Sequence, residues 1–197
     1  MNIVILTGSN RKNAASSGLA EYAAAIMRES GHTVHLIHLY NTPLPLYSPE
    51  AENLQHPGVE QLLQAFGQAD AIMLTTPEYH GSISGVLKNA LDYLGQAQFK
   101  GKAVLTASTA GGAVGISSLL QLQAIVRNLH GVNSPEWISI GGSLRSRFEG
   151  VTGFRTGMHD PASESDERIF STVGSFLRLA EGLRSGQGTA ADTSLSG

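Results

Sequence analysis

The chain contains no cysteine among its 197 residues. This absence excludes disulfide bonds, thiolate metal sites and catalysis by a cysteine nucleophile. Charged side chains are also few, at 15% of the residues, and the net charge is only -3. So mild a charge gives no indication of binding to nucleic acid or to an anionic membrane surface. We therefore expect neither nucleic acid nor a membrane as a partner.

Long hydrophobic runs are absent as well. No stretch approaches the roughly 18 apolar residues that a membrane-spanning helix needs, and the opening MNIVILTGSN lacks the basic leader of a signal peptide. On these grounds we expect a cytoplasmic protein. The hydrophobic share of 41% is that of a globular chain, and it predicts one domain over residues 1–181. Residues 182–197 are small and mostly polar, and we expect them to form a flexible tail.

What the sequence does contain is an alternation of short apolar runs with amphipathic stretches. The apolar runs predict buried strands, which we place at residues 2–7, 33–39, 71–76, 102–109 and 137–140. The amphipathic stretches predict helices, the first capped by Ser16 or Ser17 and the last beginning at Asp160-Pro161. This alternation is typical of an α/β fold in which helices cover both faces of a parallel sheet. We expect a flavodoxin-like three-layer sandwich whose five parallel strands take the order 2-1-3-4-5.

Three loops follow strands that lie side by side in this scheme, so they should meet at one edge of the sheet. They read GSNRKNAASS at 8–17, PEYHGSIS at 77–84 and TAGGAVG at 109–115. The first loop ends at a helix N-terminus, where free N–H groups and the positive end of the helix dipole attract anions. A plain serine-capped loop is the alternative interpretation. Four side chains of the segment 8–17 offer donors suited to a phosphate: Ser9, Arg11, Ser16 and Ser17.

Several well-known site patterns are missing. The chain has no GxxxxGK[ST] segment for nucleoside triphosphates, and its glycine-rich loop at 111–115 does not match GxGxxG. The glycines of this loop would instead let the backbone lie close to a flat ring. The histidines at 32, 35 and 38 alternate in direction along a strand, so we expect no metal site there.

At its three loops the sequence resembles the NAD(P)H-dependent FMN reductases, a family with the flavodoxin-like fold. The resemblance rests on G-S-x-R with downstream serines at 8–17, on P-E-Y-H-x-x-x-S-G-x-L-K-N-A-L-D-x-L at 77–94, and on A-G-G at 110–112. It extends over nearly the whole chain, from Met1 to about Gly182. The PEYH variant looks most like the azobenzene reductases. Residues 9–23 look more like the FMN reductases that supply alkanesulfonate monooxygenases.

The resemblance implies FMN as cofactor and NADPH or NADH as co-substrate. Matching positions imply that the FMN phosphate is held by Ser9, Arg11, Ser16 and Ser17. The isoalloxazine ring would be bordered, largely through backbone groups, by Pro77, Glu78, Tyr79, His80 and Gly81. The other edge of the ring would be closed by Ser108, Thr109, Gly111 and Gly112. No side chain is assigned a catalytic role and no metal is expected, because FMN carries the chemistry.

The implied reaction passes hydride from nicotinamide to N5 of FMN and then electrons to a second substrate, in a ping-pong scheme. The acceptors implied by the family are quinones, azo compounds, free flavin and metal oxyanions such as chromate. Family members are usually homodimers or homotetramers with the helix after PEYH at an interface, so Leu87, Leu91 and Leu94 serve either an interface or the core. Many relatives carry Asn or Lys where this chain has His80. That departure leaves open how the flavin edge is contacted.

Two other functions stay open at this point. A one-electron carrier like flavodoxin would bind FMN without oxidising NADPH, but such carriers are usually strongly acidic and a net charge of -3 argues against one. A flavin-free α/β enzyme that binds phosphate is the second alternative. The arginines at 145, 147 and 155 lie in a long loop at 141–160. They either bind the 2′-phosphate of NADPH or are solvated.

Overall fold

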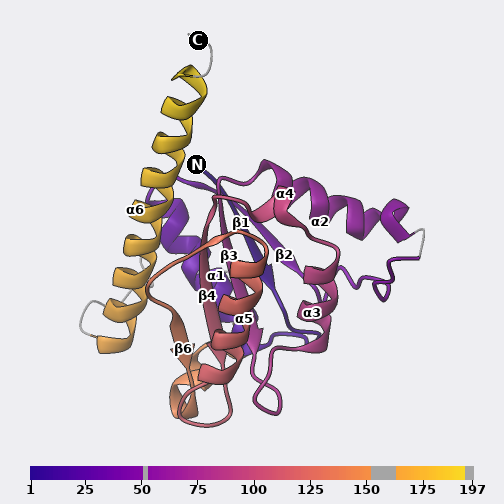
Figure 1. Cartoon of the computed structure of the whole chain (residues 1–197). Helices are drawn as coiled ribbons and strands as arrows, with labels where there is room; N and C mark the ends of the chain where they lie inside the picture. The colour runs from indigo at the N-terminus through magenta and orange to yellow at the C-terminus, as the bar shows by residue number, and fades with distance from the viewer. Residues whose placement is uncertain (51–52, 152–162, 194–197) are drawn as a thin grey trace.

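The computed structural model describes residues 1–50, 53–151 and 163–193 of the chain, and it shows a sheet between two layers of helices (Figure 1). The strands are β1 (Asn2–Thr7), β2 (Thr33–His38), β3 (Ala71–Pro77), β4 (Ala103–Thr109), β5 (Val132–Asn133) and β6 (Ile138–Ile140). The helices are α1 (Ala15–Glu29), α2 (Pro57–Gln68), α3 (Gly85–Asp92), α4 (Gln96–Phe99), α5 (Ile116–Asn128) and α6 (Glu164–Thr193). Two 3-10 segments, η1 (Asn53–Gln55) and η2 (Gly142–Arg147), complete the described elements.

The sheet is parallel and has the order β2-β1-β3-β4-β5, which confirms the predicted flavodoxin-like fold. The fifth strand differs from its prediction, because two short segments take its place along one edge of β4. The segment β5 pairs with Ala103 and Val104, and β6 pairs with residues 107–109 of the same strand. Pro135 lies between the two segments and has no N–H to donate to a ladder. The edge is therefore paired at its two ends and interrupted between them.

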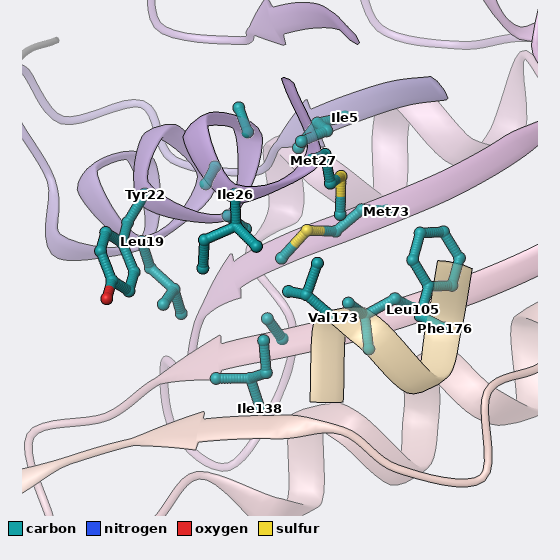
Figure 2. Close-up of a cluster of buried hydrophobic side chains, with 14 of the residues drawn as sticks. Ile5, Leu19, Tyr22, Ile26, Met27, Met73, Leu105, Ile138, Val173 and Phe176 are labelled. Atoms are coloured by element: carbon teal, nitrogen blue, oxygen red, sulfur yellow. The ribbon is translucent and has the colours of Figure 1, made fainter. Parts of the chain in front are cut away.

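One hydrophobic core lies between the sheet and the pair α1 and α6. Figure 2 shows its centre, where side chains of both helices meet those of β1, β3, β4 and β6. Every residue of β3 and β4 is buried, as expected for parallel strands covered on both faces. The labelled core residues are Ile5, Leu19, Tyr22, Ile26, Met27, Met73, Leu105, Ile138, Val173 and Phe176.

The second core lies on the opposite face of the sheet, beneath α2, α3 and α5. It contains Leu87, Leu91 and Leu94, whose exposed fractions are 0%, 3% and 5%. Of the two roles left open for these leucines, the structure decides for the core of their own chain. A subunit interface over α3 would have to be built from other residues.

The first and last helices begin or end at other residues than the sequence predicted. Helix α1 starts at Ala15 with Ala14 as its N-cap, so Ser16 and Ser17 lie inside the first turn and do not cap it. Helix α6 continues beyond Gly182 to Thr193. The flexibility expected of residues 182–197 stays a prediction. The predicted helix start at Asp160-Pro161 lies outside the described residues.

No helix in the described part of the chain is both long enough and apolar enough to cross a membrane.

Candidate functional site

Three loops meet at the carboxyl ends of β1, β3 and β4, as the strand order requires. Thr7 of β1 is in register with Thr75 of β3, and the amide of Gly8 donates to the Thr75 carbonyl at 2.7 Å. Pro77 is in register with Thr109 of β4, and the amide of Glu78 donates to the Thr109 carbonyl at 2.8 Å. The predicted composite edge therefore exists, and its three loops are residues 8–14, 78–84 and 110–115.

The first loop, residues 8–14, leads into a helix whose N-terminus has no side-chain cap. Ala14 has no side-chain oxygen, and the first turn of α1 contains no acidic residue. The first N–H groups of a helix have no carbonyl partner inside it. The Oγ atom of Ser16 is buried and makes no hydrogen bond within the described residues. These unpaired donors make the first loop suited to an anion.

The two other serines predicted for this loop lie differently. Ser9 is fully buried, and its Oγ accepts a hydrogen bond from the amide of Arg11 at 3.1 Å, which shapes the turn. Ser17 is half-buried and lines a cavity of about 250 Å³ together with Arg11, Lys12, Asn13 and His38. Ser9 therefore supports the loop from below, whereas Ser17 and Arg11 face the space around it.

The second loop forms a tight hairpin. Tyr79 and Ser82 exchange two backbone hydrogen bonds, each of 3.0 Å. Between them His80 and Gly81 have φ angles of 52° and 72°, the pair of positive values that a type I′ turn requires. Gln121 of α5 fastens this hairpin, accepting from Ser82 Oγ at 2.8 Å and donating to the Gly81 carbonyl at 3.1 Å. The tip is exposed, so the His80 side chain is accessible to a substrate.

Glu78 uses its side chain to hold α5. Its Oε2 accepts from both the amide and the hydroxyl of Ser118 at 2.9 Å. A carboxylate at this position caps the first turn of the helix and interacts favourably with the positive end of the helix dipole. Oε2 of Glu78 is therefore engaged within the chain, and so is its amide, which donates to Thr109. Nothing in the spacing of the sequence pairs Glu78 with Ser118.

The third loop is held from beneath and open above. The buried Ser108 donates to the carbonyl of Gly115, whose amide in turn donates to Ser139 Oγ at 2.9 Å. Thr109, the last residue of β4, is 4% exposed and contributes its carbonyl to Glu78. Added Cβ atoms at Gly111 and Gly112 would meet no other atom within 4 Å. The Cβ side of these two glycines thus faces open space that a flat ring could approach, while the Gly112 carbonyl accepts from the Gly142 amide at 2.8 Å.

Ser84 joins the first two loops. It was not among the site residues that the sequence predicted. Its hydroxyl donates to the Gly8 carbonyl and accepts from the Leu87 amide at 3.2 Å, so it also caps α3. Its amide donates to Thr76 Oγ1 at 3.1 Å. A serine directly before the amphipathic run at 85–94 was a signal for this cap, but its bond to Gly8 was not visible in the sequence.

Two further cavities lie at opposite ends of the strands. One of about 420 Å³ is enclosed by the first loop, the chain excursion after β2 and the start of α3, and it is mostly apolar. Its walls include Asn10, Tyr40, Leu44, Leu46 and Val86. A cavity of about 350 Å³ lies at the opposite, amino-terminal edge of the sheet, against Asn2 and Thr33. The latter is remote from the three loops and plays no part in the site.

The segment after β6 packs over the first loop. Arg147 forms a bidentate pair with the buried Asp166 of α6, with one distance of 2.6 Å, and Arg145 reaches Glu149 at 3.6 Å. Both arginine side chains stay partly exposed, Arg145 at 37% and Arg147 at 32%, and the two alternatives for them stay predictions. Arg155 lies outside the described residues. Burial, followed by the nearby Asp166, raises the pKa of the Tyr22 phenol above its ordinary value of 10.0.

The histidines of β2 belong to an edge strand. His38 is hydrogen-bonded to Thr7 Oγ1 at 3.2 Å and to Glu21 Oε1 at 3.1 Å. No group of three or more potential metal ligands occurs among the described residues. His38 thereby joins the end of β2 to β1 and α1.

Comparisons with known proteins agree on one family. The sequence model of the NADPH-dependent FMN reductases matches residues 1–144. An NADPH azoreductase of Bacillus sp. (strain OY1-2) is 33% identical over 143 residues, which are 72% of this chain and 78% of the relative. An FMN-dependent NADPH-azoreductase of Staphylococcus aureus (strain USA300) is 33% identical over 144 residues, or 71% of this chain and 76% of the relative.

Solved structures share the fold at lower identity. The apo form of the NADH:FMN oxidoreductase EMOB superposes with a TM-score of 0.70 and 23% identity, covering 89% of this chain and 87% of the other. The NAD(P)H:(acceptor) oxidoreductase FerB from Paracoccus denitrificans gives a TM-score of 0.68 and 21% identity, covering 92% and 97%. At these identities the structures establish the architecture alone.

Proposed function

Because the chain belongs to the NADPH-dependent FMN reductase family, we propose that its three loops hold FMN and that NADPH and an electron acceptor use this site in turn. The protein is an NAD(P)H-dependent flavin oxidoreductase with FMN as its cofactor. The family does not fix which residues bind FMN, which acceptor is reduced, or in what order the substrates act. For these the geometry of the loops provides the argument.

The observation that carries the assignment of the FMN phosphate is the uncapped N-terminus of α1. At the same edge α3 is capped by Ser84 and α5 by Glu78, but α1 has neither a capping oxygen nor an acid in its first turn. A phosphate there would accept from the free N–H groups of the first turn. Ser17 and Arg11 line the neighbouring cavity and would add side-chain donors. Ser9 stabilises the turn by accepting from the Arg11 amide.

The other two loops fit a flat ring. The backbone of residues 78–81 would border one edge of the isoalloxazine, and the open backbone at Gly111 and Gly112 the other. When bound, FMN supplies the redox chemistry, accepting hydride from reduced nicotinamide and returning electrons to a second substrate. The side chains of the protein keep the loops around the ring in place. Glu78 and Ser108 hold the start of α5, and Gln121 holds the hairpin. A fixed frame of this kind lowers the entropic cost of aligning substrate and ring.

For the acceptor we propose an aromatic azo compound or a quinone, with free flavin and metal oxyanions as further candidates. Both sequence relatives bear the name azoreductase. Exposed apolar and aromatic side chains surround the loops, and they suit a flat aromatic substrate: Tyr79, Val114, Ile116 and Leu120. A ping-pong scheme follows if NADPH and the acceptor occupy the same face of FMN.

A homodimer or homotetramer goes with this proposal. The surface over α3 is made by the excursion at 43–47, since Asn89 donates to the Pro45 carbonyl and accepts from the Tyr47 amide, both at 2.8 Å. Leu46 is 83% exposed and Tyr47 42% exposed. Adjacent exposed side chains of this size are suited to a partner surface. A cytoplasmic location, where NADPH is available, completes the proposal.

Replacing Arg11 by alanine tests the phosphate assignment. The variant should bind FMN about tenfold more weakly, because a charge-assisted hydrogen bond is lost from a partly exposed site. Riboflavin, which lacks the phosphate, should bind the variant and the wild type alike. Dissociation constants are measured by the quenching of flavin fluorescence at low and moderate salt.

Arg178→Ala, which removes an exposed arginine from α6, is the matched control and should leave both flavins unaffected. Equal FMN affinity of Arg11→Ala and wild type would remove Arg11 from the phosphate site. Steady-state oxidation of NADPH by the holoenzyme with an azo dye or a quinone tests the activity itself. A protein that holds FMN but shows almost no turnover with any acceptor would be an electron carrier.

A further inference from the structure

A glutamate from the far end of the chain lies against the first loop. Glu149 Oε1 is 3.6 Å from an Nη2 atom of Arg11 and equally far from Nη2 of Arg145. Its side chain is 31% exposed, whereas that of Arg11 is 58% exposed. The arginine assigned to the FMN phosphate is thus already paired with a carboxylate. Glu149 lies beyond residues 1–144, which the family model matches.

The backbone on both sides of Glu149 is fixed to the first loop and to α1. Phe148 is fully buried, and its carbonyl lies so close to α1 that a Cβ at Gly18 would be 2.1 Å from it. Gly150 donates its amide to the carbonyl of Asn13 at 3.0 Å. Glu149 is held between these two anchors, so its backbone stays beside the first loop, with Arg11 and Arg145 both within reach of its carboxylate.

We infer that Glu149 lowers and thereby sets the affinity of the site for FMN, by competing with the phosphate for Arg11. The inference rests on the proposed function. Two effects act in the same direction: the Arg11–Glu149 pair stabilises the FMN-free protein, and the carboxylate repels the phosphate dianion in the complex. Arg145 moderates both effects, because it offers the carboxylate a second partner.

A lowered affinity makes FMN exchangeable. A flavin that dissociates readily serves as a substrate that leaves in its reduced form, whereas a tightly held flavin serves as a resident cofactor. Glu149 is therefore the residue of this chain that shifts the enzyme toward exchange. Riboflavin brings no phosphate to Arg11, so its affinity should be independent of Glu149.

The test compares the flavin affinities of wild type, Glu149→Gln and Glu136→Gln. Glutamine keeps the size of Glu149 and removes its charge. FMN should bind Glu149→Gln about three- to tenfold more tightly than wild type, as expected for one charge near a partly solvated phosphate. The gain should shrink as salt is added, and more FMN should remain bound through gel filtration. Glu136→Gln carries the same charge change at an exposed position in a different cavity wall, and should behave as wild type.

A double-mutant cycle with Arg145→Ala identifies the route of the effect. If Arg145 acts by drawing Glu149 away from Arg11, its removal should weaken FMN binding in the wild-type background. In the Glu149→Gln background the same removal should have no effect. Equal weakening in both backgrounds would mean that Arg145 contacts the phosphate directly and that its moderating role is wrong.

Unchanged or weaker FMN binding by Glu149→Gln overturns the inference. So does a gain that appears equally with riboflavin or in Glu136→Gln. These failures differ from failure of the proposed function, which Arg11→Ala reports. If Arg11→Ala weakens FMN binding while Glu149→Gln leaves it unchanged, the phosphate site stands and only the role of Glu149 falls.

Discussion

Single residues in the site are chosen by contacts with neighbours far away in the chain. A Cβ at Gly8 would lie 2.7 Å from Leu87 Cβ and 2.9 Å from the Thr75 carbonyl oxygen, so only glycine lets the first loop cross α3 this closely. At the hairpin tip, His80 has a φ of 52°, a region in which asparagine is more at ease. Histidine is also enriched among the few non-glycine residues with positive φ, so the turn tolerates His80.

The first prediction at this scale concerns His80→Asn. The free energy of unfolding should be unchanged or higher by a few tenths of a kcal/mol, because asparagine suits the turn. FMN affinity should stay within about twofold, since the exposed His80 side chain is not among the donors assigned to the phosphate. The ratios of kcat/KM among azo, quinone and flavin acceptors should change instead.

His80→Val is the control for the turn, and should be less stable by about 1 kcal/mol because a β-branched residue resists a positive φ. Identical kinetics of His80→Asn and wild type with every acceptor would show that the imidazole does not contact the second substrate.

At the scale of elements, the helix N-termini at the loop edge divide into occupied and unoccupied ones. Ser84 accepts from the Leu87 amide of α3 and Glu78 from the Ser118 amide of α5, so a side chain of the protein itself caps each of these two helices. Helix α1 has its N-terminus unfilled beside Arg11. This difference, more than the number of serines in the first loop, locates the anion site.

Removing the Glu78 carboxylate should loosen α5. Glu78→Ala is expected to lower the free energy of unfolding by about 1–2 kcal/mol, the usual value of a lost cap, with urea denaturation as the measurement. Glu78→Gln keeps an acceptor and should lose less. If Glu78→Ala is as stable as wild type, the carboxylate does not cap α5. Ser118→Ala removes the hydroxyl but keeps the capped amide, so its free energy of unfolding should fall between those of wild type and Glu78→Ala.

The junction of α1, η2 and α6 carries a pH dependence. The Tyr22 ring packs against Phe148 with centroids 5.9 Å apart, and the guanidinium of Arg147 lies 5.8 Å from the Tyr22 centroid. Burial raises the pKa of the Tyr22 phenol above 10.0, so the folded chain keeps a proton that the unfolded chain releases near that pH. The unfolded state is favoured as that proton leaves, and stability falls as the pH rises past about 10.

Tyr22→Phe should therefore lose less stability than wild type as the pH rises above about 10. Thermal unfolding midpoints measured between pH 8 and about 11 should fall more steeply for wild type than for the variant. Tyr40→Phe alters an exposed tyrosine and should retain the wild-type slope. Parallel slopes for Tyr22→Phe and wild type would assign the alkaline loss to other groups.

At the scale of the whole molecule, the two hydrophobic cores account for the buried leucines and leave a different surface for assembly. Leu87 and Leu91 of α3 and Leu94 just after it belong to the second core, so a charge at Leu94 would disrupt the chain before it disrupted an oligomer. The exposed Leu46 lies in the excursion that covers α3. If subunits meet over α3, they meet through this excursion.

Leu46→Asp tests that arrangement. A charged residue in a subunit contact is buried without a partner, so the variant should have a smaller mass by light scattering and an unchanged circular dichroism spectrum. Leu54→Asp places the same charge on another exposed leucine, in η1, and should keep the wild-type mass. A folded Leu46→Asp of wild-type mass would exclude this excursion from the interface.

The sequence by itself determined the sheet and the place of the site. Strands buried on both faces are continuous apolar runs, so β1, β3 and β4 were visible directly. The alternation with helices indicated a parallel sheet, and the commonest order of five such strands was the one found. The loops after these strands must then share one edge, which placed Arg11, His80 and Gly111 together. The split of the last strand was not visible, because β5 and β6 are too short to show a period.

Only the tertiary structure decided what individual side chains in that site do. Glu78 caps a helix, Ser84 joins two loops, and Glu149 pairs with Arg11. In each case the partner lies tens of residues away or more, and a hydrogen bond or ion pair across such a separation leaves no periodic signal in a sequence. The uncapped start of α1 was hidden for a related reason: a cap depends on the backbone angles of one residue, Ala14, and not on the presence of serines nearby.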